Sequence, residues 1–230
     1  MNEVMIGFDP NFRRAWNVTA NSIIQNAKIP PSIRPIGMST LPLYRRETRR
    51  EGGKLWDGLS DAPMSTEFSL ARFFVPFVAD AHWVLFCDGD FLFRADIAEL
   101  FDLADMRYAV QVVKHEHHPI ETTKMDGRIQ TDYRRKNWSS LILWNMRHAA
   151  ANRLKILDAN TKSGLWLHQL SWLHDDEIGE LPPEWNHLVG FDKGGEDAKA
   201  LHFSEGTPDL PWYENCYFSD EWRRYDYDTR

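Results

Sequence analysis

Cysteine is scarce in this sequence, which has only Cys87 and Cys216. Two thiols cannot build the disulfide framework of a small secreted domain, and Cys87 lies in an apolar run where a buried thiol is expected. Long apolar stretches are also missing, since no run approaches the roughly 20 residues of a membrane-spanning helix. The first residues lack the pattern of a secretory signal. We therefore expect a soluble, cytoplasmic protein with at most peripheral membrane contact.

Basic residues are also fewer than acidic ones. The chain has 27 Lys and Arg against 34 Asp and Glu, which gives a formal net charge of −7. Such a chain does not neutralise a phosphate backbone over its whole surface, so we expect no nucleic-acid partner. Two local basic groups, at 45–54 and 134–136, are interpreted as solvated faces.

Apolar and aromatic residues are plentiful, with a hydrophobic fraction of 43%, ten Trp and thirteen Phe. A chain of 230 residues is long enough to bury a substantial core and fits one domain of ordinary size. Flat side chains around a cleft also suit stacking on a base or a sugar ring. The composition therefore favours a compact ligand-binding protein.

The apolar pattern alternates between the two kinds of secondary structure. Strands are predicted at 4–8, 83–87, 109–113, 140–144 and 199–203. Helices are predicted from about 11 to 27, at 66–75, after Asp96 in a capping-box arrangement with Glu99, at 147–157 and at 164–173. Residues 28–63 are interpreted as a short strand and a long loop. This order predicts a three-layer α/β sheet.

Two carboxylates, Asp88 and Asp90, follow directly after the apolar strand at 83–87. Strand alternation points both side chains to the same side, where they would repel each other. A divalent cation relieves that repulsion, and carboxylate oxygens select Mg²⁺ or Mn²⁺. Gly89 permits close approach of the backbone. Because ligands bind at the carboxyl ends of strands in an open α/β sheet, a metal that bridges a diphosphate is expected here.

An Asp-Gly-Asp sequence is by itself also an ordinary turn after a strand, and it is too short to identify an enzyme. The surrounding residues are more specific. The segment FSLARFFVPFVADAHWVLFCDGDFLFRADIAELFDL contains an arginine-bearing helix, an apolar strand, an Asp-x-Asp motif and a helix that ends in Leu-Phe. This combination resembles the donor-site segment of family 8 retaining glycosyltransferases, the group of glycogenin and the bacterial lipopolysaccharide hexosyltransferases.

Weaker matches to the same family extend along the chain. IGFDP is similar to its first strand and nucleotide-binding turn, which implies Asp9 near the base. KNWSSLILWN resembles its Asn-(Ser/Ala)-Gly strand, which implies Asn137 and Ser139 or Ser140 near the donor sugar. WLHQLSWL is similar to the Asp-Gln-Asp helix, with Gln169 at the glutamine. LPPEWN resembles the Leu-Pro-x-x-Trp-Asn segment that follows.

The segment LHFSEGTPDLPW resembles the closing motif of the family. This match implies that His202 is the third protein ligand of the ion, beside Asp88 and Asp90, and that Gly206 lies at the donor. Taken alone, a histidine after an apolar strand is more often structural. Gly206 lies one residue farther from His202 than in the family motif, and Asp209 and Leu210 stand where a lysine would hold the diphosphate.

The resemblance implies one GT-A domain over residues 1–230, with a donor-binding part at about 1–115 and an acceptor and closing part at about 116–230. It implies transfer of a hexose from a nucleotide-diphosphate sugar, a UDP-sugar, to a carbohydrate or other hydroxyl acceptor with retention of configuration. Mn²⁺ or Mg²⁺ would stabilise the leaving diphosphate. Arg72 would add positive charge to the donor, and Gln169 would lie under the anomeric carbon. Structural roles, an ordinary salt bridge for Arg72 and a polar helix position for Gln169, remain open.

The departures from the family pattern leave two alternatives open: a catalytically weak sugar-nucleotide-binding protein, and a metal-dependent nucleotide-sugar hydrolase or phosphotransferase. A further polar cluster follows the strand at 109–113. It is interpreted as lining the acceptor or phosphate side of the cleft rather than as a second metal site, and consists of Lys114, His115, His117 and His118. Further candidates for phosphate contact are Lys124, Arg135 and Lys136.

Overall fold

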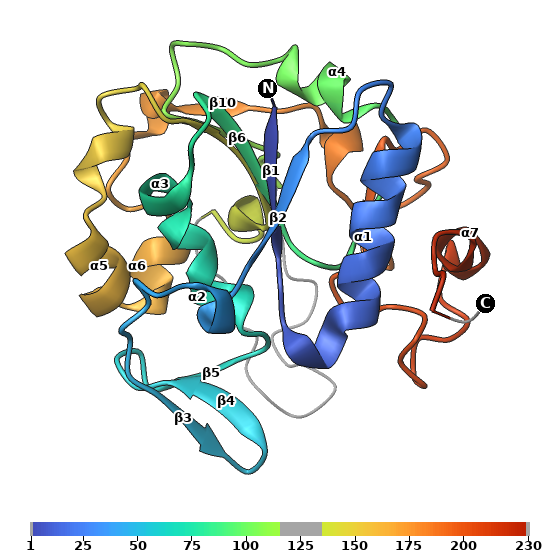
Figure 1. Cartoon of the computed structure of the whole chain (residues 1–230), viewed down its shortest axis with the longest axis horizontal. Coiled ribbons are helices and arrows are strands. Elements are labelled where there is room, and N and C mark those ends of the chain that lie inside the picture. The colour runs from blue at the N-terminus through green and yellow to red at the C-terminus, as the bar shows by residue number, and fades with distance from the viewer. Residues whose placement is uncertain (1, 116–134, 229–230) are drawn as a thin grey trace.

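The computed structural model describes residues 2–115 and 135–228. Its centre is a six-stranded sheet in the order β10–β8–β9–β6–β1–β2 (Figure 1). The strands are β1 (Glu3–Gly7), β2 (Ser32–Ile36), β6 (Trp83–Cys87), β8 (Val110–Val112), β9 (Leu141–Asn145) and β10 (Ile178–Glu180). The pairs β1–β2, β1–β6 and β8–β10 are parallel, whereas β9 runs antiparallel to β6 and β8. This mixed, mostly parallel sheet confirms the predicted α/β class.

Helices cover both faces of the sheet because the central strands are apolar on both sides (Figure 1). Val4 and Ile6 of β1 pack in one core with Ile23 of α1 (Arg13–Asn26). Met5, which points the other way, packs in a second core with α2 (Phe68–Ala71) and α3 (Val75–Val78). The alternation that defines a strand therefore decides which helix each residue of β1 meets.

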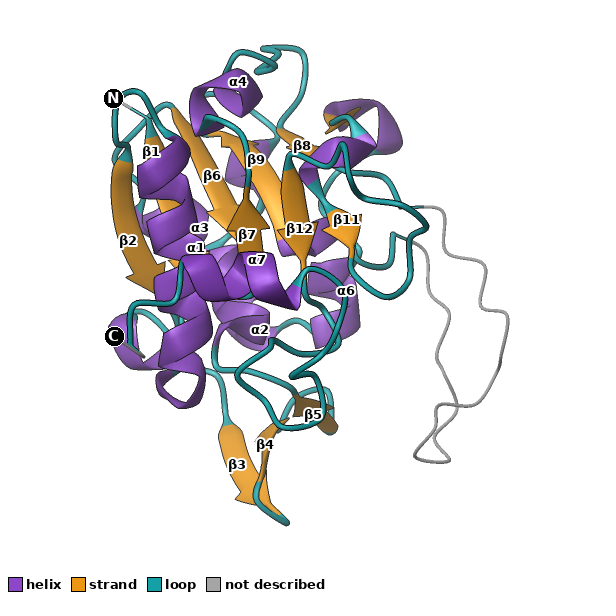
Figure 2. Cartoon of the chain, turned by 90° about the vertical axis from the view of Figure 1, so that its right-hand side faces the viewer, coloured by secondary structure: helices purple, strands orange, loops and turns teal. Residues whose placement is uncertain are grey.

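A second, three-stranded sheet lies beside the first and carries the last part of the site (Figure 2). Its strands are β7 (Phe91–Phe93), β12 (Ala200–His202) and β11 (His187–Leu188). β12 pairs antiparallel with β7, which sets His202 opposite Phe91. Helix α1 satisfies backbone groups of β7, since Thr19 Oγ1 donates to Phe91 O at 2.7 Å and Phe93 N donates to Ser22 Oγ at 3.0 Å.

The region predicted as a long loop forms a third sheet instead. It consists of β3 (Thr48–Glu51), β4 (Lys54–Asp57) and β5 (Ala62–Met64), all antiparallel. Gly52 and Gly53 make the β3–β4 turn with φ of 56° and 78°. The base of the hairpin is anchored by buried Arg46, whose Nη2 lies 2.8 Å from Asp57 Oδ2. The residues of β3 are mostly exposed and charged, so the strand lacks the apolar–polar alternation that would predict it from sequence.

Two predicted helices are shorter than expected. Within 147–157 the chain forms turns, the short 3-10 helix η5 (Ala151–Arg153) and only the start of α5 (Ile156–Thr161). Helix α6 (Gly164–His168) ends five residues before the predicted end at 173. It stops because Leu170 adopts a left-handed conformation with φ of 51°. The first prediction counted residues of the turns before α5 as helical, and the second counted residues of the turns after α6.

The remaining elements are short. They are η1 (Pro10–Phe12), η2 (Met38–Thr40), η3 (Arg72–Phe74), α4 (Ile97–Phe101), η4 (Trp138–Ser140), η6 (Asp175–Glu177), η7 (Pro183–Trp185) and α7 (Ser219–Arg224). Asp96 caps α4 as predicted, accepting from Ala98 N at 3.0 Å, but Glu99 pairs with Lys199 instead of completing a capping box. In the described ranges, every helix is too short or too polar to cross a bilayer.

Candidate metal centre

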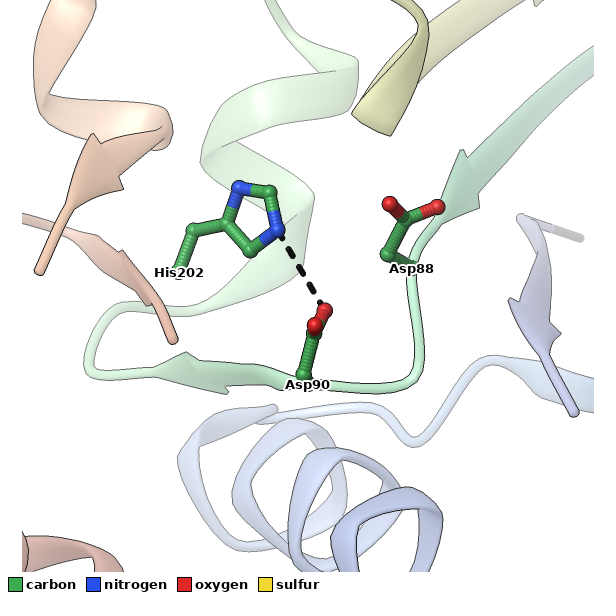
Figure 3. Close-up of side chains that lie close together, drawn as sticks. All are labelled: Asp88, Asp90 and His202. Carbon is green, nitrogen blue, oxygen red and sulfur yellow. Dashed lines mark ion pairs between the residues drawn. The ribbon is translucent and has the colours of Figure 1, made fainter. Parts of the chain in front are cut away.

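Asp88 and Asp90 lie at the carboxyl end of β6, where the chain leaves the central sheet to enter β7 (Figure 3). Asp88 N donates to Ser140 O at 2.9 Å, so the backbone at Asp88 is tied to the start of β9. Phe203 N donates to Asp90 O at 3.0 Å, which ties Asp90 to the end of β12. The two carboxylates are thus held by different neighbouring strands.

His202 is brought to the same place by the pairing of β12 with β7. Its imidazole stacks on Phe91, with the ring centroids 4.3 Å apart and the planes at 14°. Nε2 lies 3.3 Å from Asp90 Oδ1, and Figure 3 draws this contact between the ring and the carboxylate. One ligand atom each of Asp88, Asp90 and His202 lies within 4.8 Å of the other two. Within the described ranges this is the one such group of three or more acidic, histidine or cysteine residues.

The electrostatics of the group favour a cation. The pKa of Asp88 is raised from 3.8 to about 7, mainly by burial and also by the nearby Asp90 carboxylate, although Arg72 and His202 act to lower it. Asp90 Oδ1 is buried and accepts no hydrogen bond from the described part of the chain. A buried carboxylate oxygen without a donor is costly unless a cation or water satisfies it. Two carboxylates and one imidazole are a suitable ligand set for Mn²⁺ or Mg²⁺.

Arg72 does not point freely toward a donor. Its buried guanidinium places Nη2 2.9 Å from Asp88 Oδ1, and Nη1 donates to Ser139 O at 2.7 Å. The guanidinium also lies over the ring of Phe86, 5.2 Å from its centroid. Arg72 therefore partly neutralises the charge of Asp88, and its role at the donor stays a prediction.

A cavity of about 150 Å³ opens beside the group and is lined by Gly7, Phe68, Gly89, Asp90, Gly206 and Thr207 among others. Gly89 is required by the fold itself, because a Cβ there would lie 2.3 Å from the Gly7 carbonyl oxygen. Gly206 has φ of 157°, and a Cβ there would lie 2.3 Å from the ring of Tyr213. Both glycines thus keep chain segments close together at the wall of the cavity.

Asp9 lies at the end of β1 with its carboxylate fully engaged. Oδ1 accepts from Asn11 N at 2.8 Å, and Oδ2 accepts from Glu67 N at 2.9 Å. The side chain therefore joins the turn after β1 to the segment before α2. Asp9 also lines a second cavity of about 580 Å³, which shares Phe12 and Ser65 with the first. The role of Asp9 near a base stays a prediction.

The three residues predicted to lie near the donor sugar, Asn137, Ser139 and Ser140, differ in their contacts. Ser139 Oγ lies 2.9 Å from His168 Nδ1, and Ser140 Oγ donates to Asn137 O at 2.8 Å. Asn137 has a left-handed backbone with φ of 63°. Its side chain makes no hydrogen bond with the residues that the structure describes, so it is the one of the three that is available to a ligand.

Gln169 lies at the end of α6, outside the group of three ligand residues. Arg135 holds the backbone there, because its Nη1 donates to Gln169 O at 2.6 Å and to Leu170 O at 3.1 Å. The prediction that Arg135 contacts phosphate is wrong, since its side chain is only 7% exposed and is used to cap this helix. Contacts from His168 to Ser139 and from Ser139 to Arg72 connect the helix end to Asp88.

The remaining predicted residues are apart from the centre. Lys114 and His115 line a third cavity of about 590 Å³ together with His187. The predictions for His117, His118 and Lys124 lie outside the described residues. Asp209, which stands where the family motif has a lysine, accepts a hydrogen bond from Thr207 Oγ1 at 2.6 Å.

Sequence reasoning missed Asn186, a buried residue that touches the centre directly. Its Oδ1 lies 3.0 Å from His202 Nδ1, and its Nδ2 donates to Ser140 Oγ at 2.9 Å. It is the last residue of the LPPEWN segment and follows η7. The segment match was the available signal, but nothing in the sequence indicates that it faces a histidine sixteen residues later.

Comparison with known proteins gives one clear relative by sequence and several by fold. No protein-family model matches the chain. Protein CDI of Arabidopsis thaliana is 40% identical over 225 residues, which cover 95% of this chain and 83% of that protein. Identity at this level over nearly the whole chain indicates a common family.

Solved structures with the same fold are glycosyltransferases. The galactosyltransferase LgtC, in complex with donor and acceptor sugar analogs, has a TM-score of 0.57 and 16% identity over 98% of this chain and 95% of that chain. GlyE of Streptococcus pneumoniae TIGR4 gives 0.59 and 13% over 99% of this chain, and the apo bifunctional WbbM gives 0.56 and 16% over 97%. This chain spans 61% of the GlyE chain and 51% of the WbbM chain. At these identities the likeness concerns the fold, which is that of GT-A glycosyltransferases.

Proposed function

We propose that this chain, which belongs to the family of Protein CDI from Arabidopsis thaliana, is a metal-dependent glycosyltransferase with a nucleotide-sugar donor. The observation that carries the proposal is the group of Asp88, Asp90 and His202 at the carboxyl end of β6. It lies beside a cavity at the edge of the sheet where ligands bind in open α/β folds. The resemblance to family 8 enzymes supports a retaining reaction, a UDP-hexose donor and a hydroxyl acceptor.

The three residues would hold Mn²⁺ or Mg²⁺, since buried Asp90 Oδ1 lacks a donor among the described residues and the neighbouring imidazole offers a nitrogen ligand. The ion, when bound, supplies positive charge that stabilises a departing nucleoside diphosphate. Arg72 keeps Asp88 in place through its ion pair and its bond to Ser139 O. The carboxylates are therefore oriented before a ligand arrives, which is the condition for electrostatic stabilisation without reorganisation.

Gln169 is the residue that we propose to act on the sugar. Its amide is a poor nucleophile, so it would orient the donor and stabilise positive charge at the anomeric carbon by its carbonyl dipole. Arg135 fixes the backbone of the turn from which this side chain projects. Asn137, whose side-chain amide makes no hydrogen bond to the described residues, is the second group that we propose for the donor sugar.

The proposal is tested by a screen of nucleotide sugars on the purified full chain, first by thermal shift and then by release of nucleoside diphosphate. A donor present at about a hundredfold over its dissociation constant should stabilise the fold by about 2.7 kcal/mol, and only with Mn²⁺ or Mg²⁺. Asp90→Asn should abolish this shift. The matched control, Asp102→Asn at an exposed position at the C-terminal end of α4, should keep it.

The products separate the possible functions. Release that requires an acceptor identifies a transferase, whereas release into water alone identifies the hydrolase. Metal-dependent binding without release in either case identifies a sugar-nucleotide-binding protein, a result that the acidic closing motif at Asp209 would explain. A protein that binds no nucleotide sugar in any metal would contradict the proposal altogether.

A further inference from the structure

The ring nitrogen of His202 that faces away from the carboxylates is held by a chain of three hydrogen-bonding groups. His202 Nδ1 lies 3.0 Å from Asn186 Oδ1, Asn186 Nδ2 lies 2.9 Å from Ser140 Oγ, and Ser140 Oγ lies 2.8 Å from Asn137 O. Asn186, Ser140 and His202 are all buried, at 1%, 4% and 4% exposure. Water therefore has little access to this series of hydrogen bonds and cannot easily change which groups donate and which accept.

The assignment of donors and acceptors in this series of hydrogen bonds is fixed at the Asn137 end. Asn137 O is a backbone carbonyl, which only accepts, so the single Ser140 hydroxyl proton must point to it. Ser140 Oγ can then only accept from its other neighbour, so the NH₂ group of Asn186 must face it. This orientation leaves the amide oxygen of Asn186 toward His202, and an oxygen there requires a proton on Nδ1.

We propose that Asn186 is a positioning residue that keeps a proton on Nδ1 of His202, so that Nε2 offers its lone pair to the ion beside Asp90. The proposal rests on the metal centre of the proposed function. It extends that centre, because the tautomer of a ligating histidine is commonly set by an outer partner that also orients the ring. Stacking on Phe91 holds the plane of the ring, and Asn186 holds its rotation within that plane.

The backbone around Asn186 is itself rigid. Asn186 N donates to Pro183 O at 3.1 Å at the end of η7, and the next residue enters β11, which pairs with β12. β11 sets Leu188 opposite His202 in parallel register. The strand that carries the histidine and the strand that follows its partner are thus paired with each other, which keeps the amide and the ring at a constant separation.

The first test is the tautomer itself. In metal-free protein with ¹⁵N-labelled histidine, two-bond ¹⁵N–¹H correlations at a pH where the ring is neutral should show the His202 proton on Nδ1 and an unprotonated Nε2. In Asn186→Leu, which has a similar shape and no acceptor, the signal should move toward the Nε2-protonated tautomer. An Nε2-protonated ring in the parent protein would overturn the proposal.

The second test is Mn²⁺ affinity, measured by electron paramagnetic resonance of the free ion without any nucleotide. Asn186→Leu should bind Mn²⁺ about 10- to 100-fold more weakly, as found for outer partners of metal ligands. Asn186→Asp keeps an oxygen acceptor for Nδ1 and should bind at least as well as the parent. Asn145→Leu is the matched control, because Asn145 is also buried and its Oδ1 lies 3.1 Å from the ring of His82 away from the centre. It should lose stability but not Mn²⁺ affinity.

The outcomes are decisive without measuring transfer. A folded Asn186→Leu protein within twofold of the parent in Mn²⁺ affinity, or an Asn186→Asp protein as weak as Asn186→Leu, would overturn the positioning role. If Asn186→Leu does not fold, the parent tautomer and Asn186→Asp still decide. A parent that binds no Mn²⁺ overturns both this proposal and the metal centre. A parent that binds Mn²⁺ with the expected tautomer but uses no nucleotide sugar contradicts only the proposed function.

Discussion

Replacing Asp88, which is buried and forms an ion pair with Arg72, by asparagine should remove a loss of stability that the metal-free protein undergoes as the pH rises. The reason is that burial, reinforced by the Asp90 carboxylate, raises the pKa of Asp88 to about 7 from an ordinary value of 3.8. An acid whose pKa is raised in the folded state contributes its full stability below the unfolded value. That stability is lost as the pH rises through about 7.

The size of the effect follows from the shift. A rise of about three units corresponds to about 4 kcal/mol of folding free energy, of which roughly 2–3 kcal/mol falls between pH 5 and pH 8. Asparagine resembles the neutral acid at every pH and avoids this loss. The free energy of unfolding of Asp88→Asn minus that of the parent should therefore increase by roughly 2–3 kcal/mol from pH 5 to pH 8.

Urea unfolding in the presence of a chelator at pH 5, 6, 7 and 8 measures this difference directly. Mn²⁺ at pH 8 should then stabilise the parent and leave Asp88→Asn unchanged, because the ion binds only the native carboxylate pair. Asp102→Asn, at an exposed position, should differ from its parent by the same amount at each pH. A difference for Asp88→Asn that does not change with pH, or that decreases, would refute the idea that ionisation of the buried Asp88 carboxyl group destabilises the metal-free fold.

Two further predictions concern the walls of the cavities. Arg50 and Lys54 line the second cavity, and neither side chain forms an ion pair or hydrogen bond with the described residues. Changing both to glutamine should therefore weaken donor binding by roughly tenfold. Isothermal titration would check this, with exposed Arg224→Gln as the unaffected control. An unchanged affinity would exclude the hairpin from the donor site. Gly89→Ala should lower stability by roughly 1–3 kcal/mol in thermal unfolding, because its Cβ meets the Gly7 carbonyl at 2.3 Å; a parent-like melting temperature would contradict that clash.

Strands β1, β6, β8 and β9 of the central sheet were predictable because they are continuous apolar runs, whereas the short strand β10 was not predicted. The residues of β6 (Trp83–Cys87) alternate between the two cores, so both faces of the strand need apolar side chains. This requirement produces the continuous apolar run that predicts the strand from sequence. The β3–β4 hairpin was not predictable in this way. It is held by its glycine turn and by the buried Arg46–Asp57 pair, and both strands look like polar loop in sequence.

The same contrast applies to the candidate site. Asp88 and Asp90 can be predicted as a pair because they are close in sequence and follow an apolar strand. Asn186 and His202 are sixteen residues apart and are brought together by the pairing of β11 with β12, which the sequence does not show. Arg135 was misplaced for a related reason. Its charge suggested a ligand contact, but three-dimensional packing turns the guanidinium toward the carbonyl groups at the end of α6.

The pairing of β12 with β7 also has a consequence for the order in which the chain can acquire its ion. Asp90 belongs to the first half of the sequence and His202 to the last eighth, so an ion that bridges them closes a loop of about 110 residues. During synthesis the carboxylates emerge long before the imidazole. A nascent chain would hold an ion at the proposed centre only weakly until β12 has docked on β7. Once docking has occurred, an ion bound at the proposed centre would act as a reversible crosslink between early and late segments, and chelation should therefore speed global unfolding rather than loosen the site alone.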